Sequence, residues 1–314
     1  MSFERLEGQV FARRILEAAL KGERPAHAYL FEGPPGCGKK TAAFGLAASL
    51  IDPANGDGAR RVLDNKHPDL HLFQPAGATF KVDQVRDLVR EISMRPFEGS
   101  KRVFILDRVE AMTEAAANTL LKPLEEPQPS LSWVLVTTQR ARVLPTIASR
   151  CQPVRFHPLD DATLRNVLTR ELGVDAARAK DLAALSGGSV RQAQHLQSAE
   201  GKLRLEMAES FLEAIASGST VQRLSWAHGL DKERKEAQAV LPIVMVLLRE
   251  LWAEAVKLPQ ELRLLSAPPK HGRGIRPEML QHMMSALAKL QGTLASSNAN
   301  LGTALDDFVL AGMA

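Results

Sequence analysis

A glycine-rich segment, Gly33-Pro-Pro-Gly-Cys-Gly-Lys-Lys-Thr41, contains the residues of this chain best suited to chemistry. Its first seven residues fit the pattern G-x-x-x-x-G-K, in which Gly33, Gly36 and Gly38 let backbone N–H groups turn toward a phosphate. Lys39 adds a positive charge, and a helix that begins here adds a favourable dipole. The segment therefore predicts a loop that binds the phosphates of ATP or ADP.

The residue after this lysine departs from the pattern. A hydroxyl at that position binds the Mg²⁺ ion of the nucleotide, but Lys40 stands there instead. Thr41 comes one residue late, and one helical residue is a rotation of about 100°, so its hydroxyl is expected to point away from the metal. The sequence thus predicts nucleotide binding with little or no Mg²⁺-dependent hydrolysis.

A second departure agrees with the first. The run Val103-Phe-Ile-Leu-Asp107 is typical of an apolar strand that ends in an acid, which places the Asp107 carboxylate beside a nucleotide-bound metal. Capping of the following helix is the alternative role for Asp107. Hydrolytic proteins with such loops have a glutamate next, which prepares the attacking water, whereas this chain has Arg108, and Glu110 comes two positions later.

The elements that must position these residues follow an alternation of apolar runs and helical patterns over residues 1–157. This alternation predicts an α/β fold with a parallel sheet wrapped by helices. Buried strands are expected at residues 28–31, 70–73, 103–106 and 133–136, with a helix at 41–50 and a surface loop at 52–60. The glycine-rich loop then lies between a strand and a helix, as a phosphate-binding loop requires.

Helical patterns replace strands after residue 157. A small helical domain is expected at residues 158–205, where the glycines of Ser186–Arg191 end one helix and Ser189 caps the next. A larger helical domain follows at 206–314, with a central apolar helix near 237–258. Pro123 is expected to kink or break its helix, and the basic loop Pro268–Pro277 receives no role.

Composition excludes several functional classes. The 314 residues are 45% hydrophobic and 24% charged, as in soluble globular proteins, and the 5% aromatic content argues against a stacking platform for single-stranded nucleic acid. A net charge of +4 permits DNA contact without indicating it. The two cysteines, Cys37 and Cys151, exclude a disulfide framework and a four-cysteine zinc site, so we expect a cytoplasmic protein without bound metal. We also expect no membrane association, because no run of 18 apolar residues occurs.

Further motifs accompany the glycine-rich loop, among them His-Pro-Asp-Leu at 67–70 and Ser-Arg-Cys at 149–151. They lie at residues 6–9, 27–33, 67–70, 118–127, 137–138, 144–151 and 187–191, with a weaker match from 298 to 308. In these motifs the chain resembles the bacterial clamp-loader subunits of DNA polymerase III, in the AAA+ superfamily. The resemblance implies an AAA+ P-loop domain, a helical lid and a helical collar that joins subunits in a ring.

The resemblance also implies roles for single residues. It places Arg150 at a subunit interface, where its guanidinium reaches the ATP of the neighbouring subunit and stabilises charge on the transferring phosphoryl group. It makes Thr138 the residue that senses the phosphate from a strand end, and Arg191 the lid arginine that contacts it. Taken without the resemblance, Arg150 is read as a surface ion-pair residue.

The implied function is that of a stationary subunit that assists the loading of a sliding clamp on primed DNA. Its implied partners are the gamma/tau and delta subunits, the clamp and the DNA. Such stationary subunits often have an imperfect phosphate loop, so Lys40 favours this type over an ATP-hydrolysing gamma/tau-type motor. Many bind zinc through cysteines after the loop helix, but residues 51–64 contain none, so no zinc is expected. A P-loop nucleotide kinase is less favoured, because the helical part shows no evident substrate-pocket residues.

Overall fold

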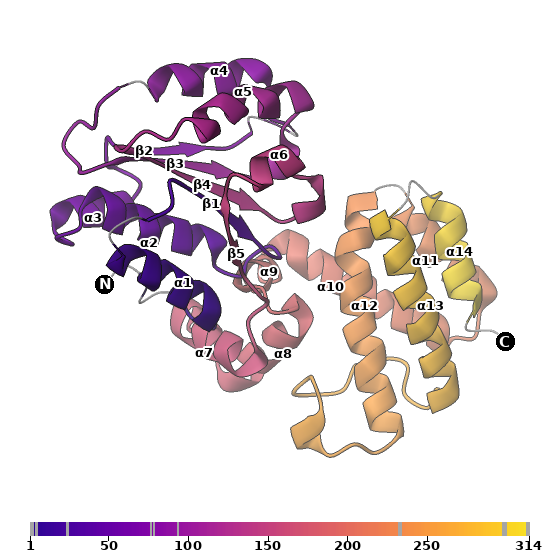
Figure 1. The fold of residues 1–314 in the computed structure, drawn as a ribbon. Helices are drawn as coiled ribbons and strands as arrows, with labels where there is room; N and C mark the ends of the chain where they lie inside the picture. Colours follow the sequence, from indigo (N-terminus) through magenta and orange to yellow (C-terminus); the bar gives the residue numbers. More distant parts are fainter. Residues whose placement is uncertain are drawn as a thin grey trace. The chain divides into compact units, whose positions relative to one another are not determined.

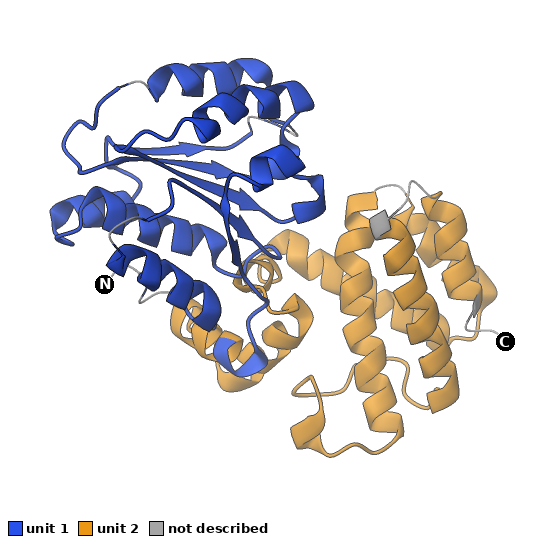
Figure 2. Ribbon diagram, viewed as in Figure 1, with its two compact units in different colours: residues 1–163 blue, residues 164–314 orange. Residues whose placement is uncertain are grey.

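The computed structural model describes residues 3, 6–22, 25–75, 77, 79–92, 94–231, 234–296 and 300–311. The chain forms two compact units, residues 1–163 and 164–314, which Figure 2 colours separately. The division lies within helix α7 (Asp161–Leu172), close to the expected change from strands to helices. Residue 205, where a further boundary was expected, lies inside helix α10 (Ala199–Ala216), and the expected lid and collar residues share the second unit.

A five-stranded parallel sheet with the order β2-β3-β4-β1-β5 forms the centre of the first unit (Figure 1). The strands are β1 (Ala28–Glu32), β2 (Leu70–Phe73), β3 (Arg102–Asp107), β4 (Leu131–Thr137) and β5 (Gln152–Arg155). The four strands predicted from apolar runs are confirmed. The sequence did not indicate β5, because Val154 is buried while its neighbours in this strand are exposed, which leaves no apolar run to detect.

Helices cover both faces of this sheet (Figure 1). They are α1 (Val10–Lys21), α2 (Lys39–Ile51), α3 (Asp57–Leu63), α4 (Val82–Glu91), α5 (Glu114–Glu125) and α6 (Pro145–Ala148), with the 3-10 turns η1 (Val109–Ala111) and η2 (Arg140–Arg142). Tyr29 and Phe31 pack into the core shared with α1, α2 and α3. Ala28 and Leu30 pack into the core shared with α4, α5 and α6. This alternation follows from the two-residue period of a strand and accounts for the fully apolar runs.

The surface loop predicted at residues 52–60 is wrong, and the break considered at Pro123 does not occur. Residues 52–60 were expected to form a surface loop, but α3 begins at Asp57. The Asp52 carboxylate accepts hydrogen bonds from the N–H groups of Gly56 and Ala59, both at 3.0 Å, and so supports the start of this helix. Helix α5 continues unbroken through Pro123 and ends two residues later. Pro123 has no N–H and so removes one intrahelical hydrogen bond, yet the helix is not broken there.

The second unit is helical. It contains most of α7 and the whole of α10. Its other elements are α8 (Ala176–Ser186), α9 (Val190–His195), α11 (Thr220–Leu230), α12 (Arg234–Ala255), η3 (Gln260–Leu262), α13 (Pro277–Ser296) and α14 (Leu301–Ala311). Helix α12 has buried residues in every turn from Ala237 to Ala253, as expected for the central helix. The predicted capping is confirmed: Gly187 ends α8 with φ of 57°, and the Ser189 hydroxyl accepts a hydrogen bond from the Gln192 N–H at 3.1 Å.

The basic segment Pro268–Pro277 lies between η3 and α13. In the residues just before it, backbone N–H groups donate hydrogen bonds to two carboxylates. The Glu250 carboxylate accepts hydrogen bonds from the N–H groups of Leu264 and Leu265 at 3.0 and 3.1 Å. The Asp181 carboxylate accepts one from the Ser266 N–H at 2.7 Å. The segment therefore begins from an anchored backbone within the second unit.

Candidate functional site

Three predicted site segments meet at the carboxyl edge of the sheet. In the strand register, Glu32 pairs with Thr137, and Asp107 pairs with Val136. The chain leaves each parallel strand at this edge, so the loop that begins at Gly33 is a neighbour of Asp107 and of the residues after Thr137. Ligands of open α/β sheets bind outside this edge.

The backbone of the loop requires glycine. The φ angles of Gly33, Gly36 and Gly38 are 152°, 74° and 95°, all in the range that favours glycine. A Cβ atom at Gly33 would lie 2.3 Å from the Phe156 carbonyl oxygen, and one at Gly38 would lie 3.1 Å from Leu6 Cδ1. The loop conformation is thus enforced by its own packing as well as by its glycines.

The Lys39 side chain is 5% exposed and folds back onto its own loop. Its Nζ donates hydrogen bonds to the carbonyl oxygens of Gly33 at 2.6 Å and Pro34 at 2.5 Å. Burial lowers the pKa of the Lys39 ammonium, and the negative charges of Glu110 and Asp107 act in the opposite direction. The ammonium lies at the loop and makes bonds that phosphate oxygens can replace.

The start of α2 fits a phosphate better than it fits a metal. Its N-cap residue is Gly38, and no side chain in the described ranges caps it, so the first N–H groups remain for a ligand. Lys40 is half-buried at the position where a hydroxyl binds Mg²⁺, and Thr41 is exposed. Backbone N–H groups and Lys39 would hold the phosphates of a nucleotide, while the usual metal ligand is replaced.

Asp107 ends β3 at the same edge. Its Oδ2 accepts a hydrogen bond from Gln74 Nε2 at 2.8 Å. The next helix, α5, is capped by Thr113, whose hydroxyl accepts from the Ala116 N–H at 3.3 Å, so Asp107 does not have the capping role considered as its alternative. Arg108 follows as an exposed residue with φ of 64°.

Glu110 is the site residue to which the sequence assigned no role. It lies in η1, is 8% exposed, and its Oε1 accepts hydrogen bonds from the Thr138 hydroxyl at 2.6 Å and the Thr138 N–H at 3.2 Å. Burial alone raises the pKa of this carboxyl, but hydrogen bonds from Thr138 and its surroundings leave it below the ordinary value. The signal was present as an acid three residues after Asp107, but its contact with Thr138 depends on the strand pairing.

Arg150 lies directly after α6, near the end of α5. Its Nη1 donates a hydrogen bond to the Thr146 carbonyl oxygen at 2.7 Å, and its Nη2 donates to the Glu125 carboxylate. The Arg150 side chain is 32% exposed and that of Glu125 is 48% exposed. The guanidinium is therefore held at the surface by an ion pair within the first unit.

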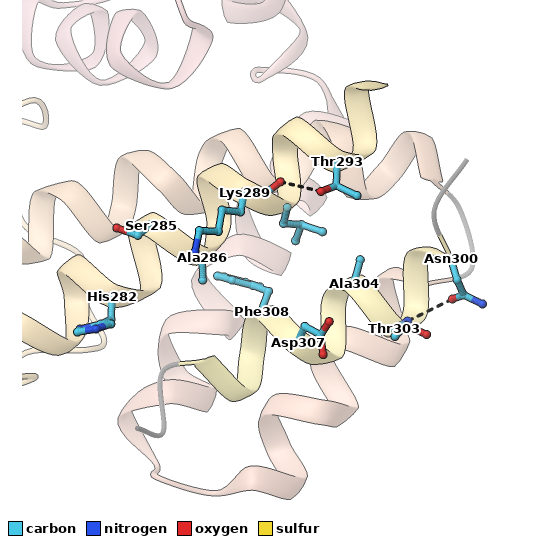
Figure 3. Close-up of a pocket in the computed structure, with 11 residues that line it drawn as sticks. His282, Ser285, Ala286, Lys289, Thr293, Asn300, Thr303, Ala304, Asp307 and Phe308 are labelled. Atoms are coloured by element: carbon cyan, nitrogen blue, oxygen red, sulfur yellow. Dashed lines mark hydrogen bonds between the residues drawn. The ribbon is translucent and has the colours of Figure 1, made fainter. Parts of the chain in front are cut away.

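The predicted site residues do not all lie in the same unit. Arg191 lies on α9 of the second unit, where it is exposed, whereas the loop, Asp107, Thr138 and Arg150 belong to the first unit. The second unit also has a groove of about 610 Å³ between α13 and α14, with Lys289, Asp307 and Phe308 among its lining residues (Figure 3). None of the predicted site residues lines this groove.

The two cysteines, possible metal ligands and possible membrane-spanning helices were the other features to consider. Burial raises the pKa of the Cys37 thiol, and it raises that of Cys151 to about 12, which opposes thiolate chemistry. Among the described residues, no three His, Cys, Asp or Glu side chains are placed to hold a metal ion together. No helix in the described part of the chain has the length and apolar character needed to span a membrane.

A phosphate-type loop between β1 and α2, with the acid Asp107 at the end of β3 on the same edge of a parallel sheet, is the arrangement of a P-loop unit. Residues 8–160 match the family model described as "DNA polymerase III, delta subunit". Over these residues the chain is similar to the clamp-loader subunits of DNA polymerase III, as its motifs indicated.

The relatives in this family include more than one subunit type. The delta-prime subunit of Bacillus subtilis is 39% identical over 165 residues, which are 50% of this chain and 50% of the relative. The delta-prime subunit of Pseudomonas aeruginosa is 39% identical over 182 residues, 54% of this chain and 56% of the relative. A Mycobacterium tuberculosis gamma/tau subunit is 36% identical over 179 residues, 54% of this chain and 31% of the relative. The matched part spans about half the length of the delta-prime relatives.

A solved structure of a gamma subunit-related protein from Thermotoga maritima aligns with 96% of this chain and 99% of that one. The identity is 17% and the TM-score is 0.44.

Proposed function

We propose that this chain is the delta-prime subunit of a DNA polymerase III clamp loader. In that role it is a stationary member of a hetero-oligomeric ring with gamma/tau and delta subunits, and it acts in the cytoplasm during loading of the sliding clamp on primed DNA. Its own loop holds ATP or ADP without turning it over, and no zinc takes part. Arg191 of the second unit contacts that nucleotide, as its motif implies.

One observation carries this proposal: the chain has a partly exposed arginine in the Ser149–Cys151 motif, while its own loop has Lys40 in place of the metal-binding hydroxyl. A guanidinium at the surface is available to a neighbour's nucleotide, where it stabilises the charge of the transferring phosphoryl group. The pair of features favours a subunit that assists hydrolysis elsewhere.

The test is to substitute Arg150→Ala and to assemble the variant with its candidate partner subunits, clamp and primed DNA. We expect normal assembly and a fall in clamp- and DNA-stimulated ATPase, because an arginine finger raises the rate of hydrolysis by ~10³-fold or more. A smaller fall is expected if other subunits of the ring supply their own arginines. Arg142→Ala, which changes another exposed arginine of the first unit, is the matched control. Normal assembly with the wild-type loading rate in Arg150→Ala would overturn the proposal.

A gamma/tau-type motor is the second candidate, favoured by the 36% identity to gamma/tau relatives. It predicts steady-state ATP turnover by the isolated chain. The arrangement around Lys40 and Arg108 favours the first candidate, because both substitutions remove groups that hydrolysis uses.

A further inference from the structure

Glu110 combines burial, charge and an unused hydrogen-bonding atom. It is 8% exposed, and its Oε2 has no hydrogen-bond partner in the described part of the chain. Burial raises the pKa of this carboxyl, but hydrogen bonds from Thr138, Thr137 and the backbone together bring it below the ordinary value, so the carboxyl is ionised near neutral pH. A buried negative charge with a free oxygen affects whatever ligand comes close to it.

The placement of Glu110 brings this charge to the phosphate end of the loop. Glu110 follows β3, Thr138 follows β4, and the loop follows β1, so all three lie at the carboxyl edge of adjacent strands. The charge of Glu110 acts on the Lys39 ammonium. In loops of this kind the backbone N–H groups cradle the first two phosphates, and the lysine reaches the second and third.

We propose that Glu110 determines nucleotide specificity at this loop: its charge disfavours a third phosphate, so the loop prefers a nucleoside diphosphate to a triphosphate. This inference rests on the proposal that the loop holds a nucleotide.

Two physical effects act against the third phosphate. A phosphate next to Lys39 is repelled by the Glu110 charge, and a half-buried site screens that repulsion less than water does. The Thr138 hydroxyl also donates its proton to Glu110 at 2.6 Å, so it must break that bond before it can donate to a phosphate. A diphosphate is held by the loop backbone and Lys39 and has no third phosphate. Repulsion by Glu110 and the loss of the Thr138 hydrogen bond therefore affect its binding less.

The experiment is calorimetric titration of the full chain and its variants with ADP and with ATP, in the presence and absence of Mg²⁺. Glu110→Gln keeps an oxygen that accepts from Thr138 and removes the charge. Glu126→Gln removes one charge at an exposed position and is the matched control. Thr138→Val removes the hydroxyl and leaves the charge, which separates the two effects.

We expect wild type to bind ADP more tightly than ATP. Glu110→Gln should shift the ratio of the two dissociation constants toward ATP by about tenfold. Glu126→Gln should leave this ratio unchanged, and Thr138→Val should shift it less than Glu110→Gln does. If Glu110→Gln does not fold, Glu110→Ala, which also removes the charge, should shift the ratio in the same direction.

An unchanged ratio in folded Glu110→Gln or Glu110→Ala would overturn the inference. If neither wild type nor Glu110→Gln binds either nucleotide, the loop is not a nucleotide site and the inference also fails. The role of Arg150 would then remain to be judged by its own experiment, because Arg150 acts on a neighbour's nucleotide.

Discussion

The two parts of the first unit that bear on nucleotide chemistry are built differently. At the chain's own loop, buried groups bond to one another: Lys39 donates to loop carbonyl oxygens, and Thr138 donates to Glu110. At the other part, Arg150 is about one-third exposed and pairs with the exposed Glu125. Groups of the first kind exchange partners at the cost of a buried hydrogen bond, whereas an exposed ion pair contributes ~0–1 kcal/mol.

Under the proposed function, this difference separates assistance to a neighbouring subunit from nucleotide binding at the chain's own loop. The loop region is tied to the sheet by backbone packing, as the contact of Gly33 with the Phe156 carbonyl shows. Arg150 depends on little more than a short helix and one surface carboxylate. Substitutions at the two places should therefore affect different measurements.

The largest effect is expected from Arg150→Lys. An ammonium cannot reproduce the planar, two-pronged contact of a guanidinium, so lysine should rescue poorly. The stimulated ATPase of the assembled complex should fall by up to ~10³-fold, close to the value for Arg150→Ala. Arg142→Lys is the matched control and should change little. Wild-type ATPase in the Arg150→Lys complex would show that charge alone matters at this position.

The next effect in size is expected from Gly33→Ala, which tests the enforced conformation of the loop. The added Cβ would meet the Phe156 carbonyl oxygen at 2.3 Å. Relieving this clash should cost roughly 3 kcal/mol, or about 10²-fold in the opening equilibrium of the first unit. Hydrogen exchange of peptides from β1 and β5 measures this opening.

Gly229→Ala is the control for this substitution, because a Cβ at that position in α11 has no atom within 4 Å. It should leave exchange in the first unit unchanged and stabilise its own helix by up to ~1 kcal/mol. Unaltered exchange of β1 and β5 peptides in Gly33→Ala would mean that the loop relaxes freely.

A smaller effect is expected from Glu125→Gln, which weakens the pair that holds Arg150. Because exposed ion pairs contribute ~0–1 kcal/mol, the free energy of unfolding should fall by no more than about 1 kcal/mol. The freed arginine should leave the stimulated ATPase of the complex equal or up to about fivefold higher. The neighbouring Glu126→Gln is the control. An ATPase loss as large as that of Arg150→Ala would mean that Glu125 positions the arginine for its task.

The sequence predicted the features that local pattern determines. Apolar runs such as residues 103–106 identified the buried strands, and the Ser189 cap was visible from glycines followed by a serine. Strand β5 and the start of α3 at Asp57 were missed, because the first is defined by pairing with β1 and the second is supported by Asp52 from outside the helix.

The candidate site divides in the same way. The loop glycines and Asp107 follow from their motifs and from the strands that precede them. Glu110 and Thr138 are 28 residues apart in the sequence, and they meet because β3 and β4 are neighbours in the sheet. The pairing of Arg150 with Glu125 depends likewise on where α5 and α6 end. Contacts between elements are set by the sheet, and no local pattern reports them.

The smallest effect is expected from Lys39→Ala on ATP turnover by the isolated chain, which should be negligible before and after the substitution. Hydrolysis needs a bound Mg²⁺ and a positioned water, but Lys40 replaces the metal-binding hydroxyl and Arg108 stands where an acid would prepare the water. A steady-state assay with excess ATP and Mg²⁺ measures this, with nucleotide binding by the same samples as the companion measurement. Lys39→Ala should weaken binding, because it removes the charge that faces the phosphates, and should leave the background rate unchanged. Wild-type turnover near ~1 s⁻¹, at the lower end for ordinary enzymes, that disappears in Lys39→Ala would establish the chain as a motor and reverse the comparison between its own loop and Arg150.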